Sequence, residues 1–242
     1  MDDPVTDPAT TAPACADLAQ HAAAVSRCTA CPRLVEWREQ VARDKRAAYA
    51  DEQYWGRPVP GFGDPEASVL VVGLAPAAHG ANRTGRMFTG DRSGDWLYRA
   101  MHRAGLANQA ASVDRGDGLA LSGAYVSAAA RCAPPANKPT TQEVATCRPW
   151  IDRELELLAP TLRVAVCLGA IGFNALWAIL KARGDALPSP RPKFGHGVEV
   201  PLASGLTIIC SFHPSQQNTF TGRLTEPMLD AVFTRAVELG TS

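Results

Sequence analysis

The sequence predicts an α/β protein built on a central parallel sheet with helices on both faces. Four short apolar runs have the length and composition of buried strands, namely Val69–Leu74, Ala124–Ala130, Leu162–Leu168 and Leu206–Phe212. Segments in which apolar residues recur at helical spacing lie between these runs. Strands that alternate with amphipathic helices indicate βαβ units, in which helices cover both faces of a parallel sheet.

Capping residues and periodicity place the remaining elements. Ser93 and Thr141 are the expected caps of the two helices that follow the first two strands. The expected helices cover 16–39, interrupted by a turn at 28–32, then 93–106, 141–158, 170–182 and 224–239, and an edge strand is expected near 198–202.

The 242 residues predict a single domain over 16–242, preceded by a disordered leader over 1–15. The leader begins MDDPVTDPATTAPA, which is acidic and proline-rich and lacks the basic region of a secretory signal. No apolar run is long enough to cross a bilayer, so no membrane partner is expected. Without an export signal, the expected location is the cytoplasm.

The positive and negative charges of the chain balance, but arginine greatly outnumbers lysine among the cations. Formal net charge is zero, so the overall charge does not point to a nucleic-acid partner. The cations are 20 Arg and 4 Lys. Arginine suits bidentate contact with phosphate, but a GC-rich genome explains an arginine excess equally well. A neutral total also leaves room for a basic face on one side of the molecule.

The segment Val69–Asp91 has the pattern of a ligand site. A buried strand ends at Gly73 and is followed by a polar, glycine-rich loop and then a helix, which is where α/β proteins place their ligands. The glycines let the backbone turn sharply and approach a ligand closely. The side chains of this loop that can carry chemistry are His79, Asn82, Arg83, Arg86, Phe88 and Asp91. The pattern alone does not identify the ligand.

Seven cysteines, an odd number, in a chain without an export signal argue against a disulfide framework. Cys28 and Cys31 form a CxxC turn, whereas Cys132 and Cys147 lie fifteen residues apart. Four thiolates suit zinc or an iron–sulfur cluster, and the wide second spacing favours the cluster. A redox-active CxxC with the second pair simply packed in the core remains an equal alternative. The other cysteines are Cys15 in the leader and Cys167 and Cys210, which lie inside strands and are expected to be inert.

Three motifs together resemble family-5 uracil-DNA glycosylases. They are GLAPAAHGANRTGRMFTGD at 73–91, RCAPPANKPT at 131–140 and HPSQQNTFTGRLT at 213–225. The similarity extends from the CxxC at 28 to the last helix, and the combination is specific where any one motif is weak. The resemblance implies the uracil-DNA glycosylase fold, with a central four-stranded parallel sheet flanked by helices and an N-terminal arm tied by a cluster.

The resemblance also implies an activity, a cofactor and a partner. The activity is hydrolysis of the N-glycosidic bond of a deaminated base in double-stranded DNA, leaving an abasic site. Uracil, hypoxanthine, ethenocytosine and hydroxymethyluracil are substrates of the family. The implied cofactor is a [4Fe–4S] cluster held by Cys28, Cys31, Cys132 and Cys147. The expected partner is DNA containing a damaged base, bound by a monomer at the nucleoid.

A base inside a duplex must be flipped into a pocket before its glycosidic bond can be cut. The residues expected to bind the base are Phe88, whose ring matches the family's stacking aromatic, and Gly73, Leu74, Ala75 and His79. His213 matches the histidine that donates a hydrogen bond to the departing base, where negative charge builds. Core packing for Phe88 and a capping role for His213 are the alternatives, and the surrounding motifs favour function.

The water nucleophile has no obvious carrier, because Ala75 stands where the wider superfamily often has Asp or Asn. Asn82 is the first candidate to orient the water, Asp91 the second and His79 the third. Asp91 is equally suited to cap the next helix. Ala128 stands where related iron–sulfur families have an Asn that reads uracil, and the loss of that amide predicts relaxed base specificity.

The segment 215–223 is expected to enter the minor groove and fill the gap left by the flipped base. Candidates for the inserted side chains are Gln217, Asn218 and Phe220. Phosphate contacts are expected from Arg83, Arg86, Arg131, Lys138 and Arg223, although a solvated surface charge is an equally good interpretation of any one of them. The competing hypothesis is a cluster-bearing DNA-binding or electron-transfer protein without hydrolytic activity. A nucleotide-binding enzyme is disfavoured, because the sequence has no GxGxxG or Walker motif.

Overall fold

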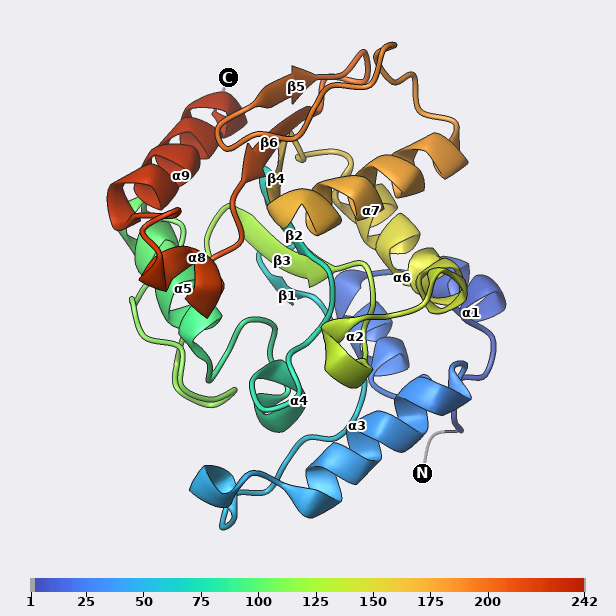
Figure 1. The fold of residues 1–242 in the computed structure, drawn as a ribbon. Helices are drawn as coiled ribbons and strands as arrows, with labels where there is room; N and C mark the ends of the chain where they lie inside the picture. The colour runs from blue at the N-terminus through green and yellow to red at the C-terminus, as the bar shows by residue number, and fades with distance from the viewer. Residues whose placement is uncertain (1–2, 242) are drawn as a thin grey trace.

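The computed structural model describes residues 3–241, and within them the strands form one six-stranded sheet in the order β1-β3-β2-β4-β6-β5 (Figure 1). The four central strands are parallel to one another and are β2 (Val69–Gly73), β3 (Ala124–Ala128), β4 (Val164–Leu168) and β6 (Thr207–Ser211). The four predicted parallel strands are therefore confirmed.

Two short antiparallel strands extend the sheet beyond the predicted four. β5 (Glu199–Pro201) pairs with β6 at the position of the expected edge strand, and β1 (Phe62–Gly63) pairs with β3 at the opposite edge. The predicted strand count is thus too low for the described chain. A two-residue strand such as β1 has no periodic pattern, so the sequence gives no signal for it.

The central strands are buried on both faces of the sheet. Every residue of β2, β3 and β4 is buried, which is why these strands are continuous apolar runs in the sequence. Val69 and Val71 point into one core, and Leu70 and Val72 point into the other. The alternation follows from the two-residue period of a strand.

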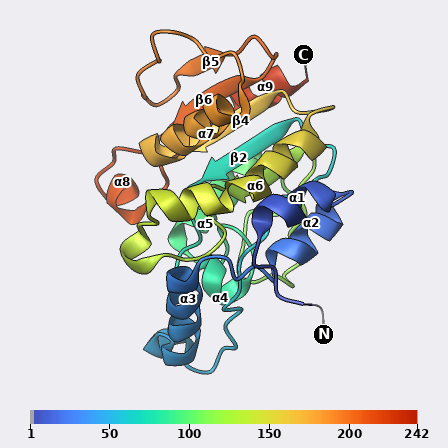
Figure 2. The same ribbon diagram turned by 90° about the vertical axis from the view of Figure 1, so that its right-hand side faces the viewer.

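Helices cover both faces of the sheet, as predicted (Figures 1 and 2). α5 (Arg92–Arg103) and α9 (Glu226–Gly240) pack against each other on one face. α6 (Thr141–Leu158) and α7 (Gly169–Arg183) pack on the other face. Within residues 3–241, no helix is long and apolar enough to span a membrane.

The helix caps differ slightly from the predicted ones. α5 is capped by Asp91 rather than Ser93, and α6 by Thr140 rather than Thr141. Thr140 forms a capping box: the Thr140 hydroxyl accepts from the Glu143 N–H at 3.1 Å, and the Glu143 carboxylate accepts from the Thr140 N–H at 2.7 Å. Four short helices lie in segments predicted as loops, namely η1 (Ala47–Tyr49), α4 (Ala81–Thr84), η2 (Pro135–Asn137) and α8 (Gln216–Phe220).

The N-terminal arm is ordered, which corrects the predicted disordered leader for residues 3–15. Its helices are α1 (Pro8–Ala14), α2 (Leu18–Val25) and α3 (Pro32–Asp44), and Figure 2 shows α1 and α2 beside α6. Asp7 caps α1, Ala12 is fully buried, and Val5 forms a bridge with Cys28. Burial of these few apolar residues outweighs the disorder-promoting composition. Residues 1 and 2 of the predicted leader lie outside the described part.

Replacing Thr140 with Ala should lower the free energy of unfolding by about 1 kcal/mol, because the side-chain cap of α6 is lost. The matched control is Thr225→Ala, since Thr225 occupies the same position before α9 but makes no side-chain cap hydrogen bond. We expect the control to change stability by less than about 0.5 kcal/mol in chemical denaturation. Equal losses in the two variants would contradict the capping role of Thr140.

Candidate active site

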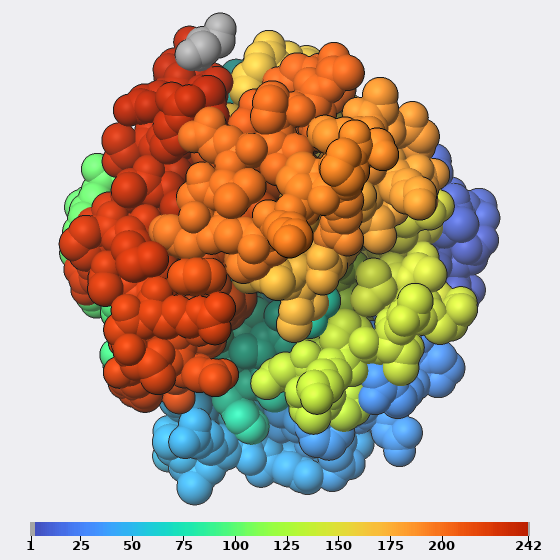
Figure 3. All heavy atoms as spheres, turned by 45° about the horizontal axis from the view of Figure 1, so that its top comes forward, coloured from blue at the N-terminus to red at the C-terminus, as the bar shows by residue number. Residues whose placement is uncertain are grey.

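A cavity of about 770 Å³ opens at the carboxyl ends of the parallel strands. The cavity walls come from the segments that follow β2, β4 and β6 and from η2, which follows β3. Figure 3 shows the hollow: the 73–91 segment lies at its floor in teal, between the 213–225 segment in red, the 169–195 region in orange and the 131–140 segment in yellow-green. Parallel strands bring their carboxyl ends to one edge, so segments far apart in sequence meet there.

Phe88 lines the cavity in a left-handed backbone conformation, with φ of 52°, that is unusual for a bulky residue. The ring lies against Gly73, where an added Cβ would be only 2.7 Å from Phe88 Cζ. Glycine at position 73 therefore provides the space for the aromatic ring. Leu74 and Ala75 also line the cavity, and the Ala75 methyl brings no polar group into it. Phe88, Leu74 and Ala75 thus lie together as predicted, with Gly73 behind the Phe88 ring.

His213 faces the same cavity from the end of β6. The centroids of the His213 and Phe88 rings are 6.1 Å apart. Gly169 permits the close approach of this segment: it has φ of +81°, and an added Cβ would lie 3.1 Å from His213 Cβ. Asn218 donates a hydrogen bond of 2.9 Å to the His213 carbonyl and fixes the turn after β6. Burial lowers the pKa of His213 to about 4, so the ring is neutral at physiological pH and retains one N–H donor.

Asp91 caps α5 and also lines the cavity. Asp91 Oδ1 accepts a hydrogen bond of 3.0 Å from the Gly94 N–H. Asp91 Oδ2 lies beside Gly80, where an added Cβ would come within 2.1 Å of that oxygen. Burial raises the pKa of Asp91 against the opposing backbone hydrogen bonds from Gly94 and Ser93. A carboxylate with a raised pKa in a cavity is suited to accept a proton from water.

Asn82 and His79 lie away from the cavity. Asn82 is fully buried in α4, and its Nδ2 donates to the Arg38 carbonyl at 3.2 Å. His79 Nδ1 is 3.0 Å from the Tyr54 hydroxyl. Neither side chain is among those that line the cavity. Of the three residues predicted to orient the water, only Asp91 lines the cavity, whereas Asn82 and His79 do not.

Three arginines predicted to contact phosphate are buried and paired, which corrects that expectation. Arg83 forms an ion pair with Glu52 and donates to the Gly90 carbonyl at 2.8 Å. Arg86 pairs with Asp117, and Arg131, which is 1% exposed, pairs with Glu154. A buried charge needs such a partner, because leaving it unpaired is costly. These three guanidiniums fix loops and helices and are not available to DNA.

The segment after β6 presents polar and aromatic side chains at the mouth of the cavity. Gln217, Asn218 and Arg223 line the cavity, as does Ser215, which caps α8. Phe220 is 68% exposed, and the Arg92 guanidinium lies 4.3 Å from the centre of its ring. Of the predicted phosphate contacts, Arg223 and Lys138 are exposed.

The geometry agrees with comparisons to known proteins. The model of the uracil DNA glycosylase superfamily matches residues 60–236. The chain is 54% identical over 217 residues to a type-5 uracil-DNA glycosylase of Mycobacterium tuberculosis (strain CDC 1551 / Oshkosh), with 90% of this chain and 80% of the relative covered. The type-5 enzyme of Thermus thermophilus is 52% identical over 215 residues, covering 89% and 94% of the two chains. The type-5 enzyme of Pyrobaculum aerophilum is 47% identical over 209 residues, covering 86% and 87%.

The chain belongs to the type-5 group of the uracil DNA glycosylase superfamily. The resemblance to this group rests on three motifs that surround the cavity, at 73–91, 131–140 and 213–225.

A second, small cavity is lined by all four cysteines that the sequence grouped together, Cys28, Cys31, Cys132 and Cys147. All seven cysteines of the chain are free thiols. Arg38 Nη1 donates to Cys132 Sγ at 3.1 Å, and the Arg131 backbone N–H donates to Cys147 Sγ at 3.3 Å. Among residues 3–241, no group of three or more His, Cys, Asp or Glu side chains is placed to hold a single metal ion. Cys15, Cys167 and Cys210 are buried elsewhere.

Several residues that line the main cavity were not predicted from the sequence. Asn137 reaches it from η2 in a left-handed conformation, with φ of 56°. Asparagine tolerates that conformation better than most residues, and the Pro-Pro-Ala-Asn run was the available signal. Phe194 and Ile171 also line the cavity. Phe194 comes from a segment without a periodic pattern. Ile171 lies in α7, where the sequence does not distinguish it from the other apolar residues of the helix.

Proposed function

We propose that this protein is a monofunctional uracil-DNA glycosylase that hydrolyses the N-glycosidic bond of uracil in DNA and leaves an abasic site. The observation that carries the proposal is the convergence of Phe88, His213 and Asp91 on one cavity at the carboxyl edge of the sheet. The names of the type-5 relatives support the same activity. A cavity of about 770 Å³ has room for a flipped nucleotide.

The reaction would begin with the flipped base stacked on the Phe88 ring. The bond between the base nitrogen and C1′ breaks, and its electron pair leaves with the base. The His213 N–H donates a hydrogen bond to the base oxygen on which negative charge grows. A neutral donor suits this task, because burial keeps His213 unprotonated. The hydrogen bond strengthens as the bond breaks, so it favours the transition state over the bound substrate.

Asp91 would position the water that attacks C1′ from the cavity and would accept its proton. The water oxygen forms the new bond to C1′, and the proton goes to the free oxygen of the Asp91 carboxylate. The other oxygen stays on the Gly94 N–H, which holds the carboxylate in one orientation. Asn82 is not assigned this role, because its side chain is bonded to the Arg38 carbonyl outside the cavity.

The substrate range would extend beyond uracil to hypoxanthine, ethenocytosine and hydroxymethyluracil in double-stranded DNA. Ala75 lines the cavity without a polar group, and Ala128 is buried in β3, so neither position offers an amide or carboxylate that would select one base edge. Such an enzyme would act as a monomer on the chromosome, in the cytoplasm at the nucleoid. The second candidate function, an iron–sulfur DNA-binding protein without hydrolysis, is favoured only by the cysteine cavity.

The four cysteines would hold a [4Fe–4S] cluster. They line one buried cavity together with Arg131. Buried guanidinium nitrogens next to these thiols have no hydrogen-bond partner among the described residues, namely Arg38 Nε and Arg131 Nε and Nη1. Unpaired buried donors are costly, and a cluster ligated by four thiolates carries the negative charge that would satisfy them. When bound, the cluster would supply a structural cross-link between the N-terminal arm and α6.

His213→Ala should lower the single-turnover rate of uracil release by about 100- to 1,000-fold, because one donor to the leaving base is lost.

Asp91→Asn should lower the single-turnover rate of uracil release by about 100- to 10,000-fold, because the proton acceptor is lost. The wild-type rate should fall as pH falls through the raised pKa of Asp91, because the protonated carboxyl cannot accept the proton of the water.

The measurement is alkaline strand cleavage of a uracil-containing duplex at excess enzyme across pH. The matched control is Asp95→Asn, an exposed carboxylate in the first turn of the same helix, which should retain the wild-type plateau rate. The acid decline should disappear in Asp91→Asn. A wild-type enzyme that releases no base would exclude the glycosylase, and an unchanged rate in Asp91→Asn would exclude its role with water.

Cys132→Ala should abolish the brown visible absorbance of the purified protein, because a cluster with three thiolates is lost during isolation. Cys15→Ala is the matched control, since Cys15 is a buried cysteine outside the four-cysteine cavity and should leave the absorbance unchanged. A colourless wild-type protein purified without oxygen, with no bound iron, would contradict the cluster. Bound zinc in its place would contradict it equally.

A further inference from the structure

The Phe88 backbone must be held in place by its neighbours, because a bulky residue does not adopt φ of 52° at no cost. On the preceding side, the Tyr98 hydroxyl donates a hydrogen bond of 2.7 Å to the Met87 carbonyl. The Phe88 carbonyl lies so close to Gly94 that an added Cβ there would be 1.8 Å away. Helix α5 therefore fixes Phe88 from one side.

The residue after Phe88 is tied to a different segment of the chain. Thr89 is fully buried, and its Oγ1 lies 2.8 Å from Ser112 Oγ and accepts a hydrogen bond of 2.9 Å from Arg86 Nε. The Gly90 N–H donates to the Ser112 carbonyl at 2.9 Å. Both residues that follow Phe88 thus depend on the segment 112–119, which does not itself line the cavity.

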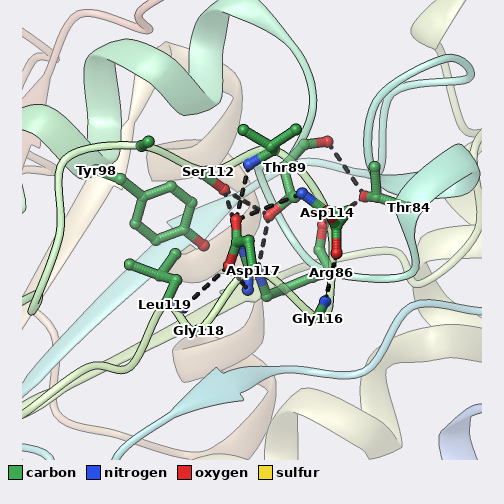
Figure 4. A network of polar contacts seen from close by, with 12 residues as sticks. Thr84, Arg86, Thr89, Tyr98, Ser112, Asp114, Gly116, Asp117, Gly118 and Leu119 are labelled. Atoms are coloured by element: carbon green, nitrogen blue, oxygen red, sulfur yellow. Dashed lines mark hydrogen bonds and ion pairs between the residues drawn. The ribbon is translucent and has the colours of Figure 1, made fainter.

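Asp117 organises that segment around a single carboxylate (Figure 4). The two carboxylate oxygens accept bidentate hydrogen bonds from Arg86, each of 2.8 Å. The same carboxylate accepts from the Val113 N–H at 2.8 Å and from the Leu119 N–H at 2.9 Å. Arg86 is 3% exposed, so the pair is shielded from solvent. One carboxylate therefore closes the 112–119 loop and clamps it to the segment that carries Phe88.

The Asp117 carboxylate is ionised under all ordinary conditions. Burial opposes ionisation, but hydrogen bonds from Arg86, Leu119 and Val113 outweigh it and hold the pKa of Asp117 well below its usual range. The clamp therefore keeps its charge across the working pH range of an enzyme, and it does not act as a pH switch.

We propose that Asp117 is a positioning residue for base excision: through Arg86 and Thr89 it fixes the Phe88 ring as the stacking platform of the flipped base. This role rests on the proposed glycosylase function. Asp117 does not touch the base. It acts through Phe88, so its contribution should vanish when the Phe88 ring is absent. A residue that merely stabilises the fold has no such dependence on Phe88.

The test is a double-mutant cycle between Asp117→Asn and Phe88→Ala, measured as single-turnover release of uracil from a duplex. With Phe88 present, Asp117→Asn should slow release about 10- to 100-fold, because a small displacement of a positioning group costs that much. With Phe88→Ala as background, the same substitution should change the rate by less than about 2-fold, as expected when two residues act as one unit. Arg86→Lys, which keeps the charge but loses the bidentate contact, should reproduce both results.

The matched control is Asp230→Asn, which removes a carboxylate that pairs with Arg103 at 2.9 Å between α9 and α5 and does not line the cavity. The control should leave the rate unchanged in both backgrounds. Equal slowing by Asp117→Asn with and without Phe88, or no slowing with Phe88 present, would overturn the positioning role while leaving the glycosylase intact. A wild-type protein that releases no uracil would overturn the proposed function and this role with it.

Discussion

The shared direction of the four central strands is the constraint on which the site depends. In the parallel register, Gly73 lies opposite Ala128 and Leu168 lies opposite Ser211, so the strands end at one edge. The loops that follow must therefore begin side by side. That edge brings Phe88 and His213 within 6.1 Å of each other between ring centroids, although 125 positions separate them in the sequence. No local interaction could bring them together; the sheet does so.

Ion pairs formed by buried arginines then hold the loops that the sheet only brings near one another. Arg83 with Glu52, Arg86 with Asp117 and Arg131 with Glu154 each join segments that are far apart in sequence. In the two pairs that are buried on both sides, Arg86–Asp117 and Arg131–Glu154, removal of one partner costs about 3–5 kcal/mol, because a charge is left buried and unpaired. Part of the arginine excess of the chain thus serves to hold the fold together.

The fold was largely predictable from the sequence, and the site only in part. Continuous apolar runs predict buried parallel strands, and the motifs around Phe88 and His213 predict a shared pocket. The sequence could not show that Arg83 and Arg86 are buried, because their partners Glu52 and Asp117 each lie 31 positions away and only the folded loops bring them close. For a similar reason the sequence could not show that Asn82 lies outside the cavity: its amide donates a hydrogen bond to a carbonyl of α3, 44 positions earlier. The N-terminal arm has the composition of a disordered segment, but α6 offers a surface on which Ala12 is buried.

The central claim is that a flipped base stacks on Phe88 with its oxygen facing His213, beside a water on Asp91. A crystal structure with duplex DNA that carries 2′-fluoro-2′-deoxyuridine, a nucleotide whose glycosidic bond resists hydrolysis, tests this claim most directly. We expect the uracil ring parallel to Phe88, the base oxygen within about 3.2 Å of a His213 ring nitrogen and a water between Asp91 and C1′. A uracil that lies outside the cavity, or inside it with His213 turned away, would contradict the account.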